Sequence, residues 1–172
     1  MVCADPSLAA LDKELARVFA LAAADSQLVP EGRGQLSAMQ LGWIKGRDDC
    51  WKADDKRQCV VENYVARIHE LRQGSADARK ADPEGVTVGP LSLACKELDF
   101  GIGMTLIAVE PGYAFLEYRD RKVTLTAVPK VPEAAYAGNT YDGLYGLITE
   151  GKLARFKAPD QPEVTCNVEE IG

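Results

Sequence analysis

The sequence has very little histidine, and it lacks the short motifs on which many enzyme and metal sites depend. His69 is the only histidine among 172 residues, so a cysteine or serine nucleophile has at most one imidazole base. Gly-x-Ser-x-Gly, phosphate-loop and His-Glu-x-x-His motifs are missing. The five cysteines contain no Cys-x-x-Cys pair, which argues against zinc. We therefore expect a protein that is not an enzyme and uses no cofactor or metal, with His69 on the surface of a helix.

The chain also lacks long apolar runs and an excess of basic residues. No run approaches the ~20 residues that span a bilayer, and no secretory signal is visible at its start. Residues 1–80 hold twelve basic and twelve acidic residues, whereas residues 81–172 hold eight basic and fourteen acidic ones. Nucleic acids and anionic membranes reward basic surfaces, so both are unlikely partners. A basic protein is the favoured partner of the C-terminal half.

Residues 1–75 carry helical periodicity. Apolar residues recur at spacings of three and four from Ser7 to about Gln73, and Asp5-Pro6-Ser7 marks a helix start. Breaks at Val29–Gly32 and between Cys50 and Val60 divide this pattern into three stripes. The sequence therefore predicts three helices in up-down-up order, packed as a bundle.

Three cysteines fall near the ends of these predicted helices. Cys3 precedes the first helix, Cys50 ends the second and Cys59 opens the third. Antiparallel packing brings all three to one end of the bundle, within the ~4.4–6.8 Å between Cα atoms that a disulfide needs. We expect a Cys3–Cys50 disulfide, with Cys50–Cys59 across the turn as the alternative. Disulfides indicate an oxidising compartment.

Residues 76–85 are predicted to be a linker, and residues 86–172 to be β-structure. The linker is rich in small and charged residues and has no periodicity. After it, short alternating segments with β-branched and aromatic residues recur, separated by turns such as Pro111-Gly112 and Arg119-Asp120. This pattern predicts a small antiparallel barrel or sandwich. A disulfide between Cys95, on an early strand, and Cys166, on the last, would contribute roughly 4 kcal/mol.

The N-terminal half resembles the LprI N-terminal family of bacterial envelope proteins. The resemblance covers nearly all of residues 3–71, in the order expected for the family. It is carried by Cys3-Ala4-Asp5-Pro6-Ser7-Leu8-Ala9-Ala10-Leu11-Asp12, Gln40-Leu41-Gly42-Trp43, Arg47-Asp48-Asp49-Cys50, Cys59-Val60 and Tyr64-Val65-Ala66-Arg67-Ile68-His69-Glu70-Leu71. The family usually has one more cysteine ahead of Cys3, which agrees with the odd number of cysteines here.

The C-terminal half resembles the family of membrane-bound and periplasmic inhibitors of c-type lysozyme. Its Ser-Gly-x-x-Tyr motif reads Ala137-Gly138-Asn139-Thr140-Tyr141 here. Its Trp-x-Lys-Gly-x-x-Ala-x-Leu motif reads Ile148-Thr149-Glu150-Gly151-Lys152-Leu153-Ala154-Arg155-Phe156. The resemblance implies a β-barrel whose first-strand and last-strand cysteines are joined, as Cys95 and Cys166 would be. The chain is thus expected to be a two-domain α+β protein, a three-helix bundle followed by a small antiparallel β-barrel.

The resemblance also implies a binding site made of two segments. In the family the motif serine and the lysine before glycine enter the lysozyme cleft, where catalysis depends on an acid and a carboxylate. Here these positions are Ala137 and Glu150, and a glutamate facing two carboxylates repels them. Lys152, or the polar Asn139 and Thr140, are candidates to supply the missing contacts. The expected lysozyme-binding residues are Ala137, Gly138, Asn139, Thr140, Tyr141, Glu150, Gly151 and Lys152.

The expected function is that of a bacterial envelope protein that binds and inhibits c-type lysozyme and so protects peptidoglycan. It would be periplasmic, or anchored to the outer membrane on its periplasmic side through a lipid that lies outside this chain. The alternative is a non-inhibitory structural or adaptor protein of the envelope, whose β domain binds another protein. The replacements at Ala137 and Glu150 favour that alternative.

Overall fold

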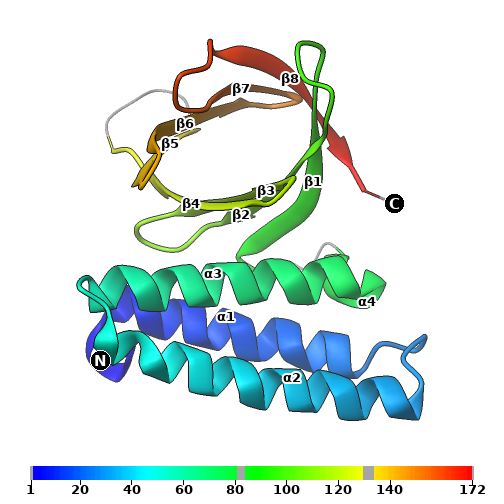
Figure 1. Ribbon diagram of the computed structural model, residues 1–172. Coiled ribbons are helices and arrows are strands. Elements are labelled where there is room, and N and C mark those ends of the chain that lie inside the picture. Colours follow the sequence, from blue (N-terminus) through cyan, green and yellow to red (C-terminus); the bar gives the residue numbers. More distant parts are fainter. Residues whose placement is uncertain (1, 81–83, 130–133, 172) are drawn as a thin grey trace. The chain divides into compact units, whose positions relative to one another are not determined.

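The computed structural model describes residues 2–80, 84–129 and 134–171 (Figure 1). Contacts divide the chain into two compact units, Met1–Val86 and Thr87–Gly172. Described helices lie in the first unit and described strands in the second, and the strands form an antiparallel β-barrel. The predicted α+β class with a barrel is therefore confirmed. No helix among the described residues has the length and apolar character to cross a membrane.

The helical unit contains three long helices and a fourth of a single turn. Both α1 and α2 pack against α3, and the three run in alternating directions in Figure 1. The short α4 falls inside the segment that its composition marked as a linker. The elements are η1 (Val2–Ala4), α1 (Pro6–Ala23), α2 (Pro30–Asp48), η2 (Asp49–Lys52), α3 (Lys56–Gly74) and α4 (Ala76–Arg79).

The core of this unit comes from α1 and α3, whose facing stripes are fully buried. Helix α1 begins at a capped N-terminus, because the Asp5 carboxylate accepts hydrogen bonds from two backbone N–H groups of the first turn. Helix α2 buries no residue completely and contains four glycines, which are poor helix formers. Its stability therefore depends on contacts to α3. The buried apolar side chains of α1 and α3 are Leu8, Leu11, Leu15, Val18, Ala22, Val60, Val61, Tyr64, Val65, Ile68 and Leu71.

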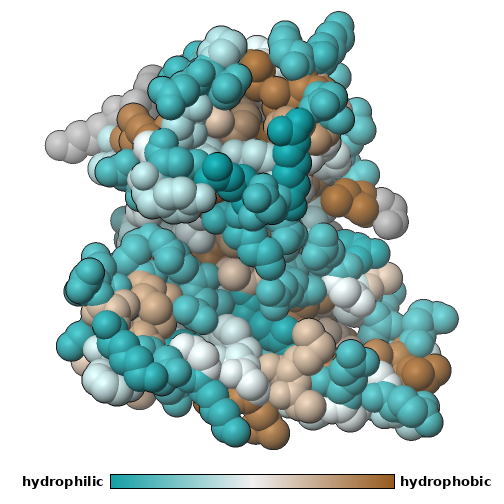
Figure 2. All heavy atoms as spheres, in the orientation of Figure 1, coloured by the Kyte–Doolittle hydropathy of each residue, from teal (hydrophilic) through white to brown (hydrophobic). Residues whose placement is uncertain are grey.

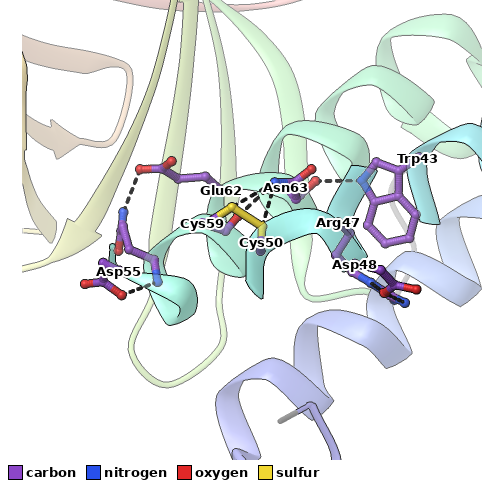
Figure 3. The surroundings of a disulfide bond; sticks show 9 residues. Trp43, Arg47, Asp48, Cys50, Asp55, Cys59, Glu62 and Asn63 are labelled. Carbon is purple, nitrogen blue, oxygen red and sulfur yellow. Dashed lines mark hydrogen bonds and ion pairs between the residues drawn. A yellow bond between two sulfur atoms is a disulfide. The ribbon is translucent and has the colours of Figure 1, made fainter. Parts of the chain in front are cut away.

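A hydrogen-bond network around Tyr64 connects the three long helices. The buried Tyr64 hydroxyl donates to Asp12 Oδ1 at 2.7 Å and accepts from Arg47 Nη1 at 2.9 Å. Arg47 also stacks over the Trp43 ring, and the Trp43 indole N–H donates to the Asn63 carbonyl oxygen at 3.0 Å (Figure 3). One tyrosine thus joins α1 to both α2 and α3.

The disulfide of the helical unit is Cys50–Cys59, so the expected Cys3–Cys50 pairing is wrong and the alternative is right. Cys50 lies in η2 and Cys59 in the first turn of α3, and their Cα atoms are 5.6 Å apart across the intervening turn (Figure 3). Asn63 buttresses the bond by donating to the Cys59 carbonyl oxygen at 2.9 Å. Cys3 lies in η1 with an exposed, free thiol.

His69 is buried rather than exposed, contrary to the expectation from its charged neighbour. It lies on α3, and its side chain is 1% exposed. The expectation failed because α3 buries polar residues, Arg67 and Arg72 among them, as well as its apolar stripe. Sequence periodicity reports only the apolar stripe.

The second unit is a closed barrel of eight strands, in which each strand pairs antiparallel with its sequence neighbours and β1 pairs with β8. Tight turns link β3 to β4 at Arg119-Asp120 and β5 to β6 at Tyr141-Asp142, and Gly151-Lys152 links β6 to β7. The strands are β1 (Thr87–Cys95), β2 (Ile102–Ile107), β3 (Tyr113–Tyr118), β4 (Arg121–Ala127), β5 (Ala134–Thr140), β6 (Gly143–Glu150), β7 (Leu153–Lys157) and β8 (Val164–Glu170).

The barrel interior is filled by alternate residues of its strands, as period-two patterning requires. Leu93, Met104, Leu116 and Leu125 are among the residues that are completely buried there. Cys95 lies directly opposite Cys166 in the β1–β8 register, and the two form the predicted disulfide. This bond joins the strands at which the barrel closes.

Candidate functional site

The first of the two expected binding segments, residues 137–141, is mostly strand. Ala137 pairs with Thr126 of β4 on one side and Gly146 of β6 on the other. Gly138 is needed for packing, since a Cβ atom there would lie 2.8 Å from both the Thr124 carbonyl oxygen and Leu125 Cδ2. Residues 137–140 therefore lie in strand β5, and of this segment only Tyr141 lies in the turn.

The register assigns the expected binding residues to faces of the barrel wall. Tyr145 and Leu147 of β6 are buried in the interior, so Gly146 and Glu150 lie on the outer face. Ala137 is the cross-strand partner of Gly146 and shares that outer face, as does Asn139 by alternation. Ala137 and Glu150, the two positions where the motif residues are replaced, are thus on one surface. They are separated by four residues of strand, roughly 13 Å at ~3.3 Å per residue.

The two expected segments nevertheless end at opposite ends of the barrel. Tyr141 is at the β5–β6 turn, whereas Gly151 and Lys152 are at the β6–β7 turn, and the length of β6 separates them. At ~3.3 Å per residue this separation is roughly 25 Å. The structure therefore offers two separate tips rather than one composite loop.

The β6–β7 tip presents an ammonium group beside a carboxylate that shares one arginine with a second carboxylate. Gly151 has a φ of 60°, a backbone conformation that favours glycine, which makes the two-residue turn possible. The Glu150 carboxylate forms an ion pair with Arg155 at 3.5 Å, and Arg155 also approaches Glu163 at 3.7 Å. Among the described residues, no ion pair involves the exposed Lys152 side chain. The tip therefore presents a positive charge to a partner.

The β5–β6 tip presents a braced aromatic ring. Tyr141 is 92% exposed, the largest fraction among the exposed large hydrophobic residues. Its hydroxyl accepts a hydrogen bond from Arg121 at 2.8 Å, and Arg121 also pairs with Asp142 in the same turn. The Thr140 hydroxyl donates to Asp142 and, ahead of other contributions, lowers the pKa of that carboxyl. Tyrosine and arginine are common anchors of protein interfaces, so this tip is a second candidate contact.

Behind the Tyr141 tip, the mouth of the barrel encloses a cavity of about 570 Å³. The Tyr118 hydroxyl donates to the Tyr145 hydroxyl at 3.3 Å, and Tyr145 donates to Asp142 Oδ2 at 3.0 Å. Burial, followed by these hydrogen bonds, raises the pKa of Tyr145, so its hydroxyl stays protonated and acts as a donor rather than a base. The chain of hydroxyls holds Asp142, and through it the tip, in place.

Sequence reasoning missed Arg121 and Asp142, which organise this tip. Asp142-Gly143 is a dipeptide typical of tight hairpins, and Gly143 has a φ of 128°. That signal was available in the sequence and predicts a hairpin at this position. Arg121 comes from the neighbouring β4 and had no comparable local signal.

The surface pattern and the placement of acidic residues limit the kinds of site that the protein can have. On the face drawn in Figure 2, hydrophilic residues predominate and hydrophobic ones form small separate groups. Among residues 2–80, 84–129 and 134–171, no three histidine, cysteine or acidic side chains are grouped so that they could hold a metal ion. Charge and individual side chains, rather than one broad apolar patch, characterise the visible face.

No family model, curated protein or solved structure matches this chain. The functional assignment therefore depends on the sequence motifs and on the geometry of the described residues.

Proposed function

We propose that this chain is a bacterial envelope protein whose barrel unit binds and inhibits c-type lysozyme. In this proposal residues 1–75 form a three-helix bundle domain and residues 86–172 a separate lysozyme-binding domain. The observation that carries the proposal is the preformed β6–β7 tip, which presents the Lys152 ammonium next to a Glu150 carboxylate already paired with Arg155. Two disulfides support an oxidising location such as the periplasm.

The tip has the chemistry needed to occupy a glycosidase cleft. Lysozyme cleaves its substrate with an acid and a carboxylate that flank the scissile bond. An ammonium group can donate to both and exclude the substrate. Glu150 alone would repel these groups, and its exposed ion pair with Arg155 at 3.5 Å, an arginine that Glu163 shares, reduces this repulsion in part. Lys152, two residues beyond the family's lysine position, takes over the role of the missing ammonium.

The rest of the barrel supports approach of a basic partner. Residues 81–172 hold eight basic and fourteen acidic residues, and this excess accelerates association with a basic protein at low ionic strength. On the outer wall, the small and apolar residues Ala137, Gly146 and Ile148 lie beside the basic residues Arg155 and Lys157 of β7. In this proposal electrostatic attraction by the acidic barrel sets the association rate, and the β6–β7 tip causes inhibition.

The test compares two lysine variants of the full chain that change net charge equally. Lys152→Ala removes the ammonium from the tip, whereas Lys96→Ala removes an exposed lysine in the connection between β1 and β2, at the opposite end of the barrel. We expect Lys152→Ala to weaken inhibition of cell-wall lysis about tenfold, or about 1.4 kcal/mol. Lys96→Ala should leave it unchanged. Equal effects of the two variants would remove Lys152 from the site.

A second candidate, a non-inhibitory adaptor of the envelope, is favoured by Ala137, which lacks the family's hydroxyl and lies within the sheet. The variant Ala137→Ser/Glu150→Lys distinguishes the two candidates, because both residues lie on the same outer face. If the natural chain does not inhibit lysozyme and the double variant does, the adaptor function is supported. If the natural chain inhibits and Lys152→Ala inhibits about tenfold less, the proposed function stands.

A further inference from the structure

Helix α2 packs one face against α3, and the helical unit leaves the opposite face uncovered. On the packed side, Gln40, Trp43 and Arg47 form hydrogen bonds to residues of α3. The residues on the other side of the helix are all exposed, and α2 buries none of its residues. We call this exposed side the outer face of α2. It consists of Glu31, Gly34, Gln35, Ala38, Leu41, Gly42 and Lys45.

The middle of the outer face is small and apolar. Gly34, Ala38 and Gly42 follow one another at a spacing of four, which aligns them along the helix. A Cβ atom at either glycine would have no neighbour within 4 Å, and Leu41 beside them is 63% exposed. The distance between two packed helices depends on the side chains at their contact, so a second helix can approach this strip closely.

The ends of the outer face carry opposite charges. Glu31 and Lys45 are exposed, and neither forms an ion pair among the described residues. Each lies seven residues from Ala38, roughly 10.5 Å along the helix axis, on opposite sides of it. A helix that covers the outer face should therefore present a positive charge near Glu31 and a negative charge near Lys45.

The outer face itself meets this requirement when it is reversed. In a twofold dimer the same surface of both copies is in contact, so that residue i meets j and j meets i. With the axis at Ala38 and the helices antiparallel, Gly34 lies opposite Gly42 of the second copy, and Glu31 lies opposite Lys45. Gln35 and Leu41 are paired by the same operation. All seven residues thus find a partner within the same face.

We propose that two copies of this chain associate through the outer faces of α2, antiparallel, with the twofold axis at Ala38. Two ion pairs between Glu31 and Lys45 set the direction and the register, and the glycines allow the helices to approach closely. The face has seven residues on each side, against roughly 20–30 in a standard interface, so we expect weak association. The dimer involves the helical unit and does not depend on lysozyme binding by the barrel.

The position of the axis is tested by crosslinking Ala38→Cys in the full chain, with Cys3→Ser to remove the free exposed thiol. With helix axes ~8–10 Å apart and Cα atoms ~2.3 Å from each axis, the two Cα atoms at position 38 would lie roughly 5 Å apart, as a disulfide requires. Mild oxidation should therefore produce a covalent dimer. Ser37→Cys in the same background is the control, because exposed Ser37 is turned about 100° around the helix from Ala38 and should remain monomeric.

The register is tested by exchanging the charges and following self-association by sedimentation equilibrium. Glu31→Lys alone, or Lys45→Glu alone, brings like charges together twice in the dimer and should weaken it about tenfold. The double variant Glu31→Lys/Lys45→Glu should restore association, because the opposite pairs are formed again. These charges also suit the dipole of a single helix, but loss of that interaction would lower stability in the double variant and could not restore a dimer.

Close approach is tested with Gly42→Gln, which should fold because a Cβ atom there has no neighbour within 4 Å, and which should weaken the dimer about tenfold. Gly74→Gln is the matched control, since Gly74 is an exposed glycine at the end of α3 with equally open surroundings. It should associate like the parent chain. The proposal is overturned if Ala38→Cys forms no covalent dimer, or forms no more than Ser37→Cys does. It is also overturned if the double charge variant associates no better than the single variants, or if Gly42→Gln associates like the parent.

Discussion

Removal of the Cys95–Cys166 disulfide should destabilise the barrel unit. This loss should be larger than the loss of stability that the helical unit suffers when the Cys50–Cys59 disulfide is removed. Cys95 and Cys166 are 71 residues apart in sequence, and the chain-entropy relation gives about 4.4 kcal/mol for closing such a loop. Cys50 and Cys59 are 9 residues apart, which gives about 2.7 kcal/mol. The barrel disulfide is therefore predicted to contribute about 1.7 kcal/mol more to the free energy of unfolding than the helical disulfide does.

The assay is equilibrium unfolding in urea of two double variants, Cys95→Ala/Cys166→Ala and Cys50→Ala/Cys59→Ala. Cys3→Ser is included in every protein, the parent as well, because its free exposed thiol could exchange with the disulfides. Both tryptophans, Trp43 and Trp51, lie in the helical unit, so their fluorescence reports its unfolding. Five of the six tyrosines lie in the barrel unit, so near-ultraviolet circular dichroism after subtraction of the tryptophan signal reports the barrel.

The refuting result is specific. A fall of less than about 1 kcal/mol in the barrel's free energy of unfolding would show that its closure does not depend on the bond. A larger fall for the helical variant than for the barrel variant would reverse the order that the loop lengths impose. Either result contradicts the assignment of the Cys95–Cys166 bond as the main covalent restraint on the barrel.

Two further predictions concern side chains that the fold constrains. Gly138→Ala should lower the barrel's free energy of unfolding by about 1–3 kcal/mol, because the new Cβ atom meets the Thr124 carbonyl oxygen at 2.8 Å. Gly146→Ala is its control, since the nearest atom there lies 3.9 Å away, and equal urea midpoints for the two variants would contradict this account. Burial, and then the bond to Asp12, raises the pKa of Tyr64 to about 12, so its proton is held more tightly in the folded state than in the unfolded state, where tyrosine titrates near ~10. Below pH ~10 the Tyr64 hydroxyl should leave the stability of the helical unit constant, and from pH ~10 to ~12 the free energy of unfolding should decline. The decline should be less steep in Tyr64→Phe. The same slope in urea titrations of both proteins would refute the raised pKa of Tyr64.

Much of the barrel could be predicted from the sequence, because its strands bury alternate residues. The turn at Arg119-Asp120 was predicted where the structure has it, and the Cys95–Cys166 bond was predicted from the positions of these cysteines on an early and the last strand. Strand β5 was missed because alanine, glycine and asparagine have low strand propensity. Those small residues are there for close packing on β4, which is a property of strand pairing rather than of local sequence.

In the helical unit and at the candidate sites, local sequence predicted which residues take part, whereas their contacts depend on residues that are distant in sequence. The sequence indicated that Cys3, Cys50 and Cys59 lie at helix ends, but the pairing expected first, Cys3–Cys50, was wrong, and the locally closed Cys50–Cys59 bond forms. Glu150 and Lys152 were predicted as candidates, yet Arg155, which pairs with Glu150, comes from the adjacent strand. The buried Arg67 Nη2 atom has no hydrogen-bond partner among the described residues, a feature that depends on the atoms around it and that no spacing in the sequence could reveal.

The central claim is tested most directly by titrating the full chain against c-type lysozyme at low ionic strength while following lysis of bacterial cell walls. We predict a stable complex on size-exclusion chromatography and lysis that falls to zero as the chain reaches one equivalent of enzyme. Unchanged lysis at tenfold excess of the chain, with no complex on the column, would contradict the claim that the barrel unit is a lysozyme inhibitor.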